Sequence, residues 1–246
     1  MLLKDKKVLI TGAGRGIGRQ TAISMAEEGA VILGAGRTEE PLADMAKEIR
    51  RSGGRVFIRT MDIADDEEVR QVVEALAEEA GGIDVLVNCA GIFKEAFFLD
   101  MTPKQWKETV DVDLTGVYNV THAAISHIIE AKGSIVNIVS QDAFYGCPGY
   151  SHYSACKAAV VGLSRTLARE LGPLGVRVNC VAPGITETDM TRDRIDKGLQ
   201  EYLEKLPVGR IGQPQDIADA VIFLASEKAG FITGQVIHSN GGMYLG

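Results

Sequence analysis

Short runs of apolar, mostly β-branched residues recur along the chain and alternate with longer amphipathic segments. Runs this short and this apolar are typical of strands that are buried on both faces of a parallel sheet. The pattern predicts strands at Val8–Thr11, Val31–Leu33, Val56–Ile58, Val85–Val87, Ile135–Val139 and Val176–Val181.

The segments between these runs have helical spacing. In Asp65–Ala80, acidic residues open the segment and Val69, Val72, Val73 and Leu76 fall on one face. The predicted helices are Pro41–Arg51, Asp65–Ala80, Lys104–Glu130 and Ser154–Leu171.

Alternation of strands and helices predicts right-handed βαβ units. Because no linker or repeat divides the chain, we expect a single doubly wound α/β domain over residues 1–246, with helices on both faces of a parallel sheet. The stretch Pro183–Arg210 has no sustained period, apart from a helix that Arg194–Leu206 can form. We therefore expect a substrate loop around residues 184–210.

Composition excludes several classes of protein. The net charge of −7 over 246 residues disfavours binding to nucleic acid or to anionic membrane surfaces. No stretch is long and apolar enough to span a bilayer, and the N-terminus lacks the pattern of a signal peptide. Four cysteines without paired spacing indicate reduced thiols in a cytoplasmic protein and no metal site.

A glycine-rich turn follows the first predicted strand and opens a helix near Ile17. It reads Thr11-Gly12-Ala13-Gly14-Arg15-Gly16-Ile17-Gly18, with the spacing TGxxxGxG. Such glycines let the backbone approach a pyrophosphate, which binds to the free N–H groups of the helix N-terminus. No Gly-Lys-Ser/Thr follows, so the turn is not a P-loop. We expect nucleotide binding by Gly12, Gly14, Arg15, Gly16, Ile17 and Gly18.

The end of the second strand bears on cofactor choice. An enzyme that prefers NAD usually has a carboxylate there for the ribose 2′-hydroxyl. This chain has Gly36 and then Arg37, whose guanidinium suits a 2′-phosphate, and Arg15 is a second positive charge nearby. The sequence predicts NADP(H), with NAD(H) as the alternative if Arg37 points to solvent.

Tyr153 and Lys157 are four residues apart and therefore lie on one face of a predicted helix. A nearby ammonium favours the phenolate and makes a tyrosine usable as the acid and base for a carbonyl–alcohol pair. Ser140 ends a strand whose carboxyl end meets the start of that helix at one sheet edge. Ser140, Tyr153 and Lys157 are therefore candidate catalytic residues.

Taken together, these motifs resemble those of the short-chain dehydrogenase/reductase family. They particularly resemble those of its 3-oxoacyl-(acyl-carrier-protein) reductase branch. The similarity runs from about Lys4 to Gly246. It rests on Thr11–Gly18, Asp62, Asn88–Gly91, Ser140, Tyr153, Lys157, Pro183–Gly184, Thr186, Thr188 and Phe231–Tyr244. The resemblance implies a Rossmann domain with a seven-stranded parallel sheet, a homotetramer, and hydride transfer between NAD(P) and a carbonyl or alcohol.

The resemblance also assigns roles. Tyr153 would exchange the proton of the substrate oxygen, Ser140 would hydrogen-bond that oxygen, and Lys157 would hold the nicotinamide ribose. Asp62 would meet the adenine amine, and Thr188 with the Ile185 backbone would hold the carboxamide. The implied cofactor-binding set is completed by Ile63, Asn88, Ala90, Gly91, Pro183 and Gly184.

Two positions depart from the family pattern, and a third neighbourhood matches it only in part. Asp113 stands where an asparagine joins a proton relay to the lysine, and its charge would favour protonated Lys157. Cys89 replaces another asparagine. Near the expected substrate entrance, Lys132 is the one basic residue where two are usual, which weakens the case for an acyl carrier protein.

Other residues and functions compete with this interpretation. All four histidines are expected to be structural, and Phe93, Phe97, Phe98, Phe144 and Tyr145 fit either a substrate pocket or the core. The alternatives are an NAD-dependent alcohol, steroid or sugar dehydrogenase of the same family and a non-catalytic nucleotide-sensing regulator. We expect a small carbonyl or alcohol substrate, and the sequence does not name it.

Overall fold

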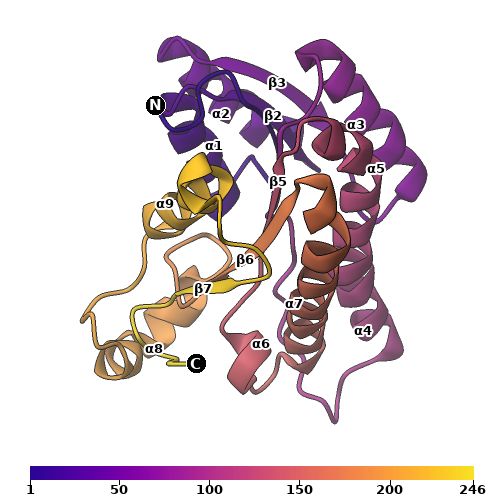
Figure 1. Ribbon diagram of the computed structural model, residues 1–246. Coiled ribbons are helices and arrows are strands. Elements are labelled where there is room, and N and C mark those ends of the chain that lie inside the picture. Colours follow the sequence, from indigo (N-terminus) through magenta and orange to yellow (C-terminus); the bar gives the residue numbers. More distant parts are fainter.

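All the predicted apolar runs form strands of one parallel sheet in the computed structural model, which describes residues 1–246 (Figure 1). The strand order is β3-β2-β1-β4-β5-β6-β7. From β1 to β3 each new strand is added on one side of β1, and from β4 onward on the other side, so the order reverses between β1 and β4. The strands are β1 Lys7–Thr11, β2 Val31–Gly36, β3 Arg55–Thr60, β4 Val85–Asn88, β5 Ser134–Ile138, β6 Arg177–Pro183 and β7 Val236–Ser239.

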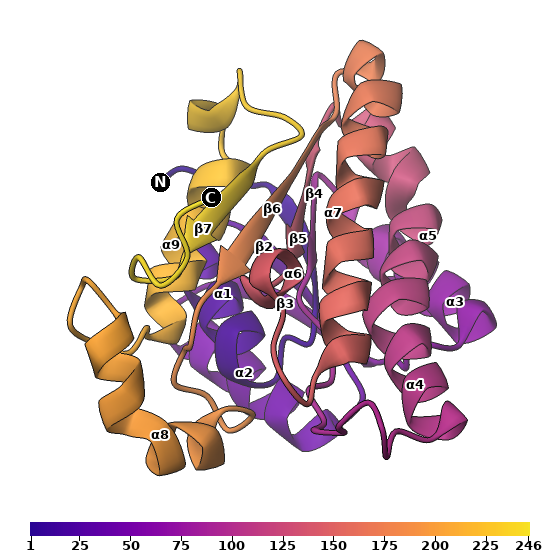
Figure 2. The same cartoon turned by 90° about the horizontal axis from the view of Figure 1, so that it is seen from below.

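Helices cover both faces of the sheet. Seen from below, α1, α2 and α9 lie on one face, and α3, α4, α5 and α7 lie on the other (Figure 2). The helices are α1 Gly16–Glu27, α2 Glu39–Arg51, α3 Asp66–Ala80, α4 Pro103–Val110, α5 Gly116–Glu130, α6 Asp142–Tyr145, α7 Ser151–Leu171, α8 Arg192–Lys205 and α9 Pro214–Ala225. No helix is long and apolar enough to cross a membrane.

The apolar runs are continuous because each strand packs on both faces. In β1, Val8 and Ile10 belong to the core beneath α1, α2 and α9, whereas Leu9 belongs to the core beneath α3, α5 and α7. Successive side chains of a strand point to opposite faces, so an apolar residue is needed at every position. The predicted doubly wound α/β fold is confirmed.

The helix predicted over Lys104–Glu130 is present, and it contains a turn that its apolar pattern does not indicate. A π-helical turn at Asp111–Thr115 separates α4 from α5. Such turns insert an extra residue into the helical repeat and are frequent at functional sites. Here the turn carries Asp113, which is fully buried.

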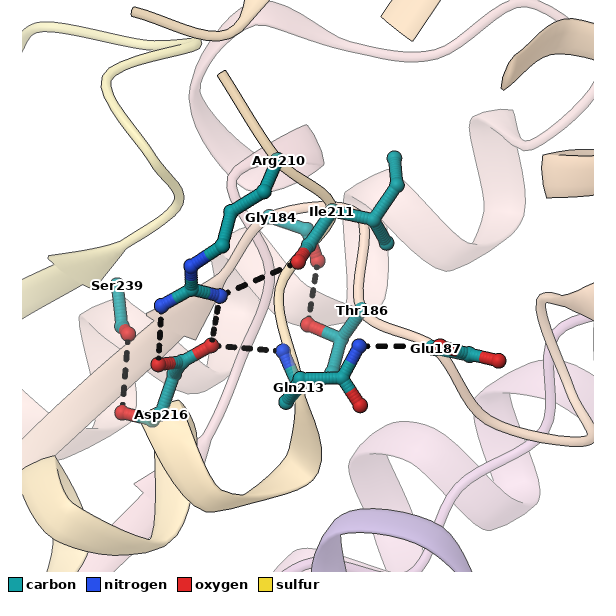
Figure 3. A network of polar contacts seen from close by, with 8 residues as sticks. All are labelled: Gly184, Thr186, Glu187, Arg210, Ile211, Gln213, Asp216 and Ser239. Atoms are coloured by element: carbon teal, nitrogen blue, oxygen red, sulfur yellow. Dashed lines mark hydrogen bonds and ion pairs between the residues drawn. The ribbon is translucent and has the colours of Figure 1, made fainter. Parts of the chain in front are cut away.

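The irregular stretch after β6 forms a lid (residues 187–211) that contains α8 and stands apart from both helical layers (Figure 2). Its two ends meet at a bridge between Thr186 and Gly212. Around this bridge, Arg210 pairs with Asp216 of α9 at 2.6 Å, and Gln213 donates to Glu187 at 3.0 Å (Figure 3). The base of the lid is therefore tied to α9.

Candidate active site

A cavity of about 620 Å³ lies at the carboxyl ends of the strands. Ligands of doubly wound folds bind at this edge, where the strand order reverses. Nearly all the predicted site residues line it: Gly12, Gly14, Arg15, Gly16, Ile17, Gly18, Arg37, Asp62, Ile63, Ala90, Gly91, Asp113, Ser140, Tyr153, Lys157, Pro183, Gly184, Ile185 and Thr188. The exception is Asn88.

The glycine-rich turn is as compact as its spacing suggests. Gly12 has a φ of +69°, and a Cβ on Gly18 would lie 2.3 Å from the Gly12 carbonyl oxygen. Helix α1 begins directly after Arg15 without a side-chain cap and without an acidic residue in its first turn. Its first N–H groups are therefore available to an anion in the cavity.

Two arginines line the end of the cavity next to β2. Arg15 and Arg37 are both exposed, and neither forms an ion pair within the chain. At the end of β3, Asp62 accepts from the Ala64 N–H at 3.0 Å, and Asn119 of α5 holds the Ile63 carbonyl at 3.0 Å. This end of the cavity thus offers positive charge beside a fixed loop.

Ser140, Tyr153 and Lys157 come together at the centre of the cavity. The Ser140 hydroxyl accepts from the Asp142 N–H at 3.1 Å, and its hydrogen bond to Tyr153 favours the phenolate. Burial nevertheless raises the pKa of Tyr153 to about 12, although the Lys157 ammonium opposes the shift. The expectation that Lys157 favours the phenolate is correct in direction, but burial outweighs it here.

Asp113 forms a direct ion pair with Lys157, with 3.0 Å between Oδ1 and Nζ, and both side chains are buried. Its other oxygen accepts from the Ile92 N–H at 3.1 Å. A Cβ on Gly91 would lie 2.5 Å from the carboxylate, so the glycine admits it. Burial alone would lower the pKa of Lys157, but the Asp113 carboxylate holds that pKa above its usual value. Lys157 is therefore held in its charged form.

Asn88 is the predicted cofactor-binding residue that does not line the cavity. Its buried amide donates to Thr121 at 3.0 Å and to Asn137 at 2.8 Å. Asn137 in turn donates to Ser164 of α7 at 2.8 Å. The side chain thus belongs to an internal network that joins β4 and β5 to the helices above them. The sequence placed Asn88 at the right strand end but could not give its orientation.

Asp142 and Arg194 line the cavity although no motif in the sequence points to them. Asp142 is buried at the start of α6, and burial raises its pKa. Arg194 reaches into the same cavity from α8. Single charged residues in segments without periodicity give no signal in one sequence. Their shared location appears only in the folded chain, where the Arg194 side chain reaches Cys147 in the segment between α6 and α7.

The aromatic and histidine residues fall into separate groups. Phe93 and Tyr145 line the cavity, whereas Phe144 packs against His238 and Tyr244, and Phe97 and Phe98 are exposed. None of the four histidines lines the cavity. The buried His152 has a pKa lowered by burial, so it carries no charge into the site.

Lys132 does not lie near the cavity of its own chain. It follows α5 and precedes β5, at the amino-end edge of the sheet, and it lines a smaller cavity there with Lys6 and Arg177. The catalytic candidates occupy the opposite edge. The expected basic entrance is therefore not formed by Lys132 within one chain.

A doubly wound sheet with an uncapped phosphate loop and a Ser–Tyr–Lys cluster in one cavity defines a nicotinamide-dependent oxidoreductase. The chain belongs to the short-chain dehydrogenase/reductase family, and residues 12–244 match the family model described as enoyl-(acyl carrier protein) reductase. It is an NAD(P)-dependent enzyme that acts on a carbonyl or alcohol, similar to the 3-oxoacyl-thioester reductases.

Curated relatives agree with this assignment over the whole chain. The sequence is 39% identical to 3-oxoacyl-[acyl-carrier-protein] reductase FabG of Thermotoga maritima over 246 residues, covering all of both chains. It is 40% identical to the enzyme of the same name from Staphylococcus aureus, covering 98% of each chain.

Solved structures of the family are similarly close. A short-chain dehydrogenase/reductase of Brucella melitensis, titled glucose/ribitol dehydrogenase, superposes with a TM-score of 0.95 at 34% identity and covers 100% of this chain and 99% of the other. A dehydrogenase/reductase of Sinorhizobium meliloti gives a TM-score of 0.94 at 36% identity, with 99% and 96% covered. These relatives are named for different substrates, so the choice between the substrates must rest on the residues of the site.

Proposed function

We propose that the protein is an NADP(H)-dependent reductase of 3-oxoacyl thioesters, which transfers a hydride between nicotinamide and a carbonyl or secondary alcohol. The observation that carries the proposal is the meeting of Ser140, Tyr153 and Lys157 in the cavity that also holds the phosphate loop. Residues 1–246 would form one cofactor-binding and catalytic unit, with the segment 184–210 as its substrate loop.

The residues present fit a dinucleotide. The free N–H groups at the start of α1 suit a pyrophosphate. The turn that presents them needs a glycine at position 18, because a side chain there would clash with the Gly12 carbonyl oxygen. When bound, the nicotinamide supplies or accepts the hydride. Asp62, Ile63, Ala90 and Gly91 would line its adenosine and central part, and Pro183, Gly184, Ile185 and Thr188 its nicotinamide end.

The protein's own groups would handle the proton. In the reductive direction the Tyr153 hydroxyl donates its proton to the substrate oxygen, and the Ser140 hydroxyl donates a hydrogen bond to the same atom. Lys157 stabilises the resulting phenolate by its charge. The contact with Asp113 keeps Lys157 protonated, so that charge is present throughout.

The test measures kcat/KM with NADP(H) and NAD(H) on the parent and on Arg37→Ala. A charge-assisted hydrogen bond is worth roughly 1.5–3 kcal/mol, so we expect about a ten- to hundredfold preference for NADP(H) that Arg37→Ala reduces. Arg51→Ala, which removes an exposed arginine from the far end of α2, should leave the preference unchanged. Preference of the parent for NAD(H) would favour the alternative alcohol, steroid or sugar dehydrogenase.

The thioester assignment rests on the curated relatives and is tested by turnover of an acetoacetyl thioester. Turnover of sugars or polyols in its place would support the alternative indicated by the name of the Brucella structure. Tight cofactor binding without turnover of any carbonyl compound would support the nucleotide-sensing regulator. The presence of Ser140, Tyr153 and Lys157 in one cavity argues against that last alternative.

We expect a homotetramer. The apolar C-terminal stretch has neighbours within its own chain: Tyr244 packs on Phe144, and Met243 accepts from Gln141. Large exposed apolar residues instead precede and follow the start of α4, namely Phe97, Phe98, Leu99 and Trp106. Such a patch favours an interface. Light scattering at micromolar concentration tests it, and a monomeric mass would contradict it.

A further inference from the structure

Arg194 is placed by the lid at the substrate end of the cavity. It lies near the start of α8, is half-buried, and lines the cavity together with Ser140 and Tyr153. The lid is held at its base, where Arg210 bonds Asp216 and Gln213 bonds Glu187 (Figure 3). The position of Arg194 is therefore supported from both ends of the lid.

Three aromatic rings surround the Arg194 guanidinium. Its central carbon lies 5.2 Å from the ring centre of Tyr150, 5.6 Å from that of Phe93 and 5.8 Å from that of Tyr202. Phe93 also packs edge-on against Tyr153, with 4.8 Å between ring centres. A single aromatic ring, that of Phe93, therefore contacts both the guanidinium and Tyr153, the proposed acid/base.

Most N–H groups of Arg194 have no acceptor within the protein. A guanidinium has five N–H donors, and this half-buried side chain can present the unused ones to a ligand in the cavity. The one hydrogen bond of the Arg194 side chain goes to the weak acceptor Sγ of Cys147, at 3.2 Å, and no carboxylate lies within ion-pair distance. A charged, donor-rich group held against aromatic faces in a substrate cavity calls for an acceptor from the ligand.

Asp142 decides which kind of acceptor fits. It lines the same cavity, and Arg194 acts on its carboxylate electrostatically without forming an ion pair. Because this carboxylate partly balances the guanidinium charge and would repel a second anion, a neutral carbonyl oxygen fits better than a free carboxylate.

We infer that Arg194 binds the second carbonyl oxygen of a 1,3-dicarbonyl substrate, which in a 3-oxoacyl thioester is the thioester carbonyl. This inference rests on the proposed function and specifies how the site distinguishes such substrates from simple ketones. Tyr153 and Ser140 hold the reacting oxygen, and Arg194 holds the oxygen two carbons away.

The experiment compares ethyl acetoacetate with 2-heptanone, which has the same chain length but no second carbonyl. The parent and Arg194→Met are assayed on both, since methionine keeps the unbranched stem that packs on the rings. We expect Arg194→Met to lower kcat/KM for ethyl acetoacetate about ten- to a hundredfold more than for 2-heptanone. Arg194→Lys should give an intermediate loss. Arg192→Met, which alters an exposed neighbour on α8, should leave kcat/KM unchanged for both substrates.

The outcomes separate this inference from the proposed function. Equal losses on both substrates would show that Arg194 only anchors the lid and would overturn the inference while leaving the proposed function standing. A larger effect of Arg194→Met on free acetoacetate than on its ethyl ester would assign the site to a carboxylate and would overturn it as well. Failure of the parent to reduce any carbonyl compound would overturn the proposed function and this inference with it.

Discussion

Asp113 and Lys157 lie in contact at 3.0 Å, whereas Asp142 and Arg194 share the same cavity without forming an ion pair. Both sets of charges act on Tyr153 or its neighbours. The closed pair satisfies its charges internally and so fixes the position and protonation of Lys157. The open set leaves donors unsatisfied and so presents them to a ligand. The charges in direct contact thus belong to the part of the site that carries out the chemistry. The charges without such a contact belong to the part that selects the substrate.

We expect the largest effect from removing the Tyr153 hydroxyl, whose pKa responds to Lys157, Asp113 and Asp142. Tyr153→Phe keeps the ring that packs on Phe93 but removes the proton donor. Positioned proton transfer typically contributes ~10²–10⁴-fold, and we expect kcat to fall by that factor. Cofactor affinity, measured by fluorescence titration, should change little. Parent-like turnover in this variant would contradict the assignment of Tyr153.

A second prediction compares how much Asp113 and Asp142 each contribute to the free energy of unfolding. Asp113→Ala leaves Lys157 buried without a partner, and breaking a buried pair in this way costs about 3–5 kcal/mol of unfolding free energy. Asp142→Ala removes hydrogen bonds but strands no buried cation, so about 0.5–1.5 kcal/mol is expected. Denaturant unfolding measures both. Adding Lys157→Met to Asp113→Ala should recover most of the loss, and equal costs of the two single variants would contradict the distinction.

The smallest effect is a shift in pH dependence. The Asp113 carboxylate raises the pKa of Tyr153 and also holds up the pKa of Lys157, so Asp113→Asn should lower the pKa of Tyr153 at any pH where Lys157 keeps its proton. Alcohol oxidation needs Tyr153 as a proton acceptor, and its rate rises with pH as the phenol ionises. The rise should therefore occur at lower pH in the variant, as read from the profile of kcat/KM. A shift to higher pH would mean that Lys157 loses its proton first.

The cofactor end of the site was predictable because its residues are contiguous and its chemistry belongs to the backbone. The stretch Thr11–Gly18 carries the whole turn in one motif, and each strand is a short apolar run. Tyr153 and Lys157 were recognisable for a similar reason, since one helical turn separates them.

The substrate end was not predictable because tertiary folding assembles it. Arg194 comes from the lid, Asp142 from a four-residue helix and Phe93 from the loop after β4, and no spacing links them. The π-helical turn at Asp111–Thr115 was missed because an apolar pattern does not register one inserted residue. The orientation of Asn88 was not predictable either, since a strand-end residue can face either the cavity or the interior.

The bridge between Thr186 and Gly212 brings the two ends of the lid together. A segment whose ends already meet can change in length at small entropic cost, because closure depends only weakly on the number of residues. Residues 187–211 therefore form an exchangeable segment whose two ends leave the scaffold side by side. Relatives with lids of different length and sequence could be grafted at this junction, changing substrate choice without refolding the scaffold beneath.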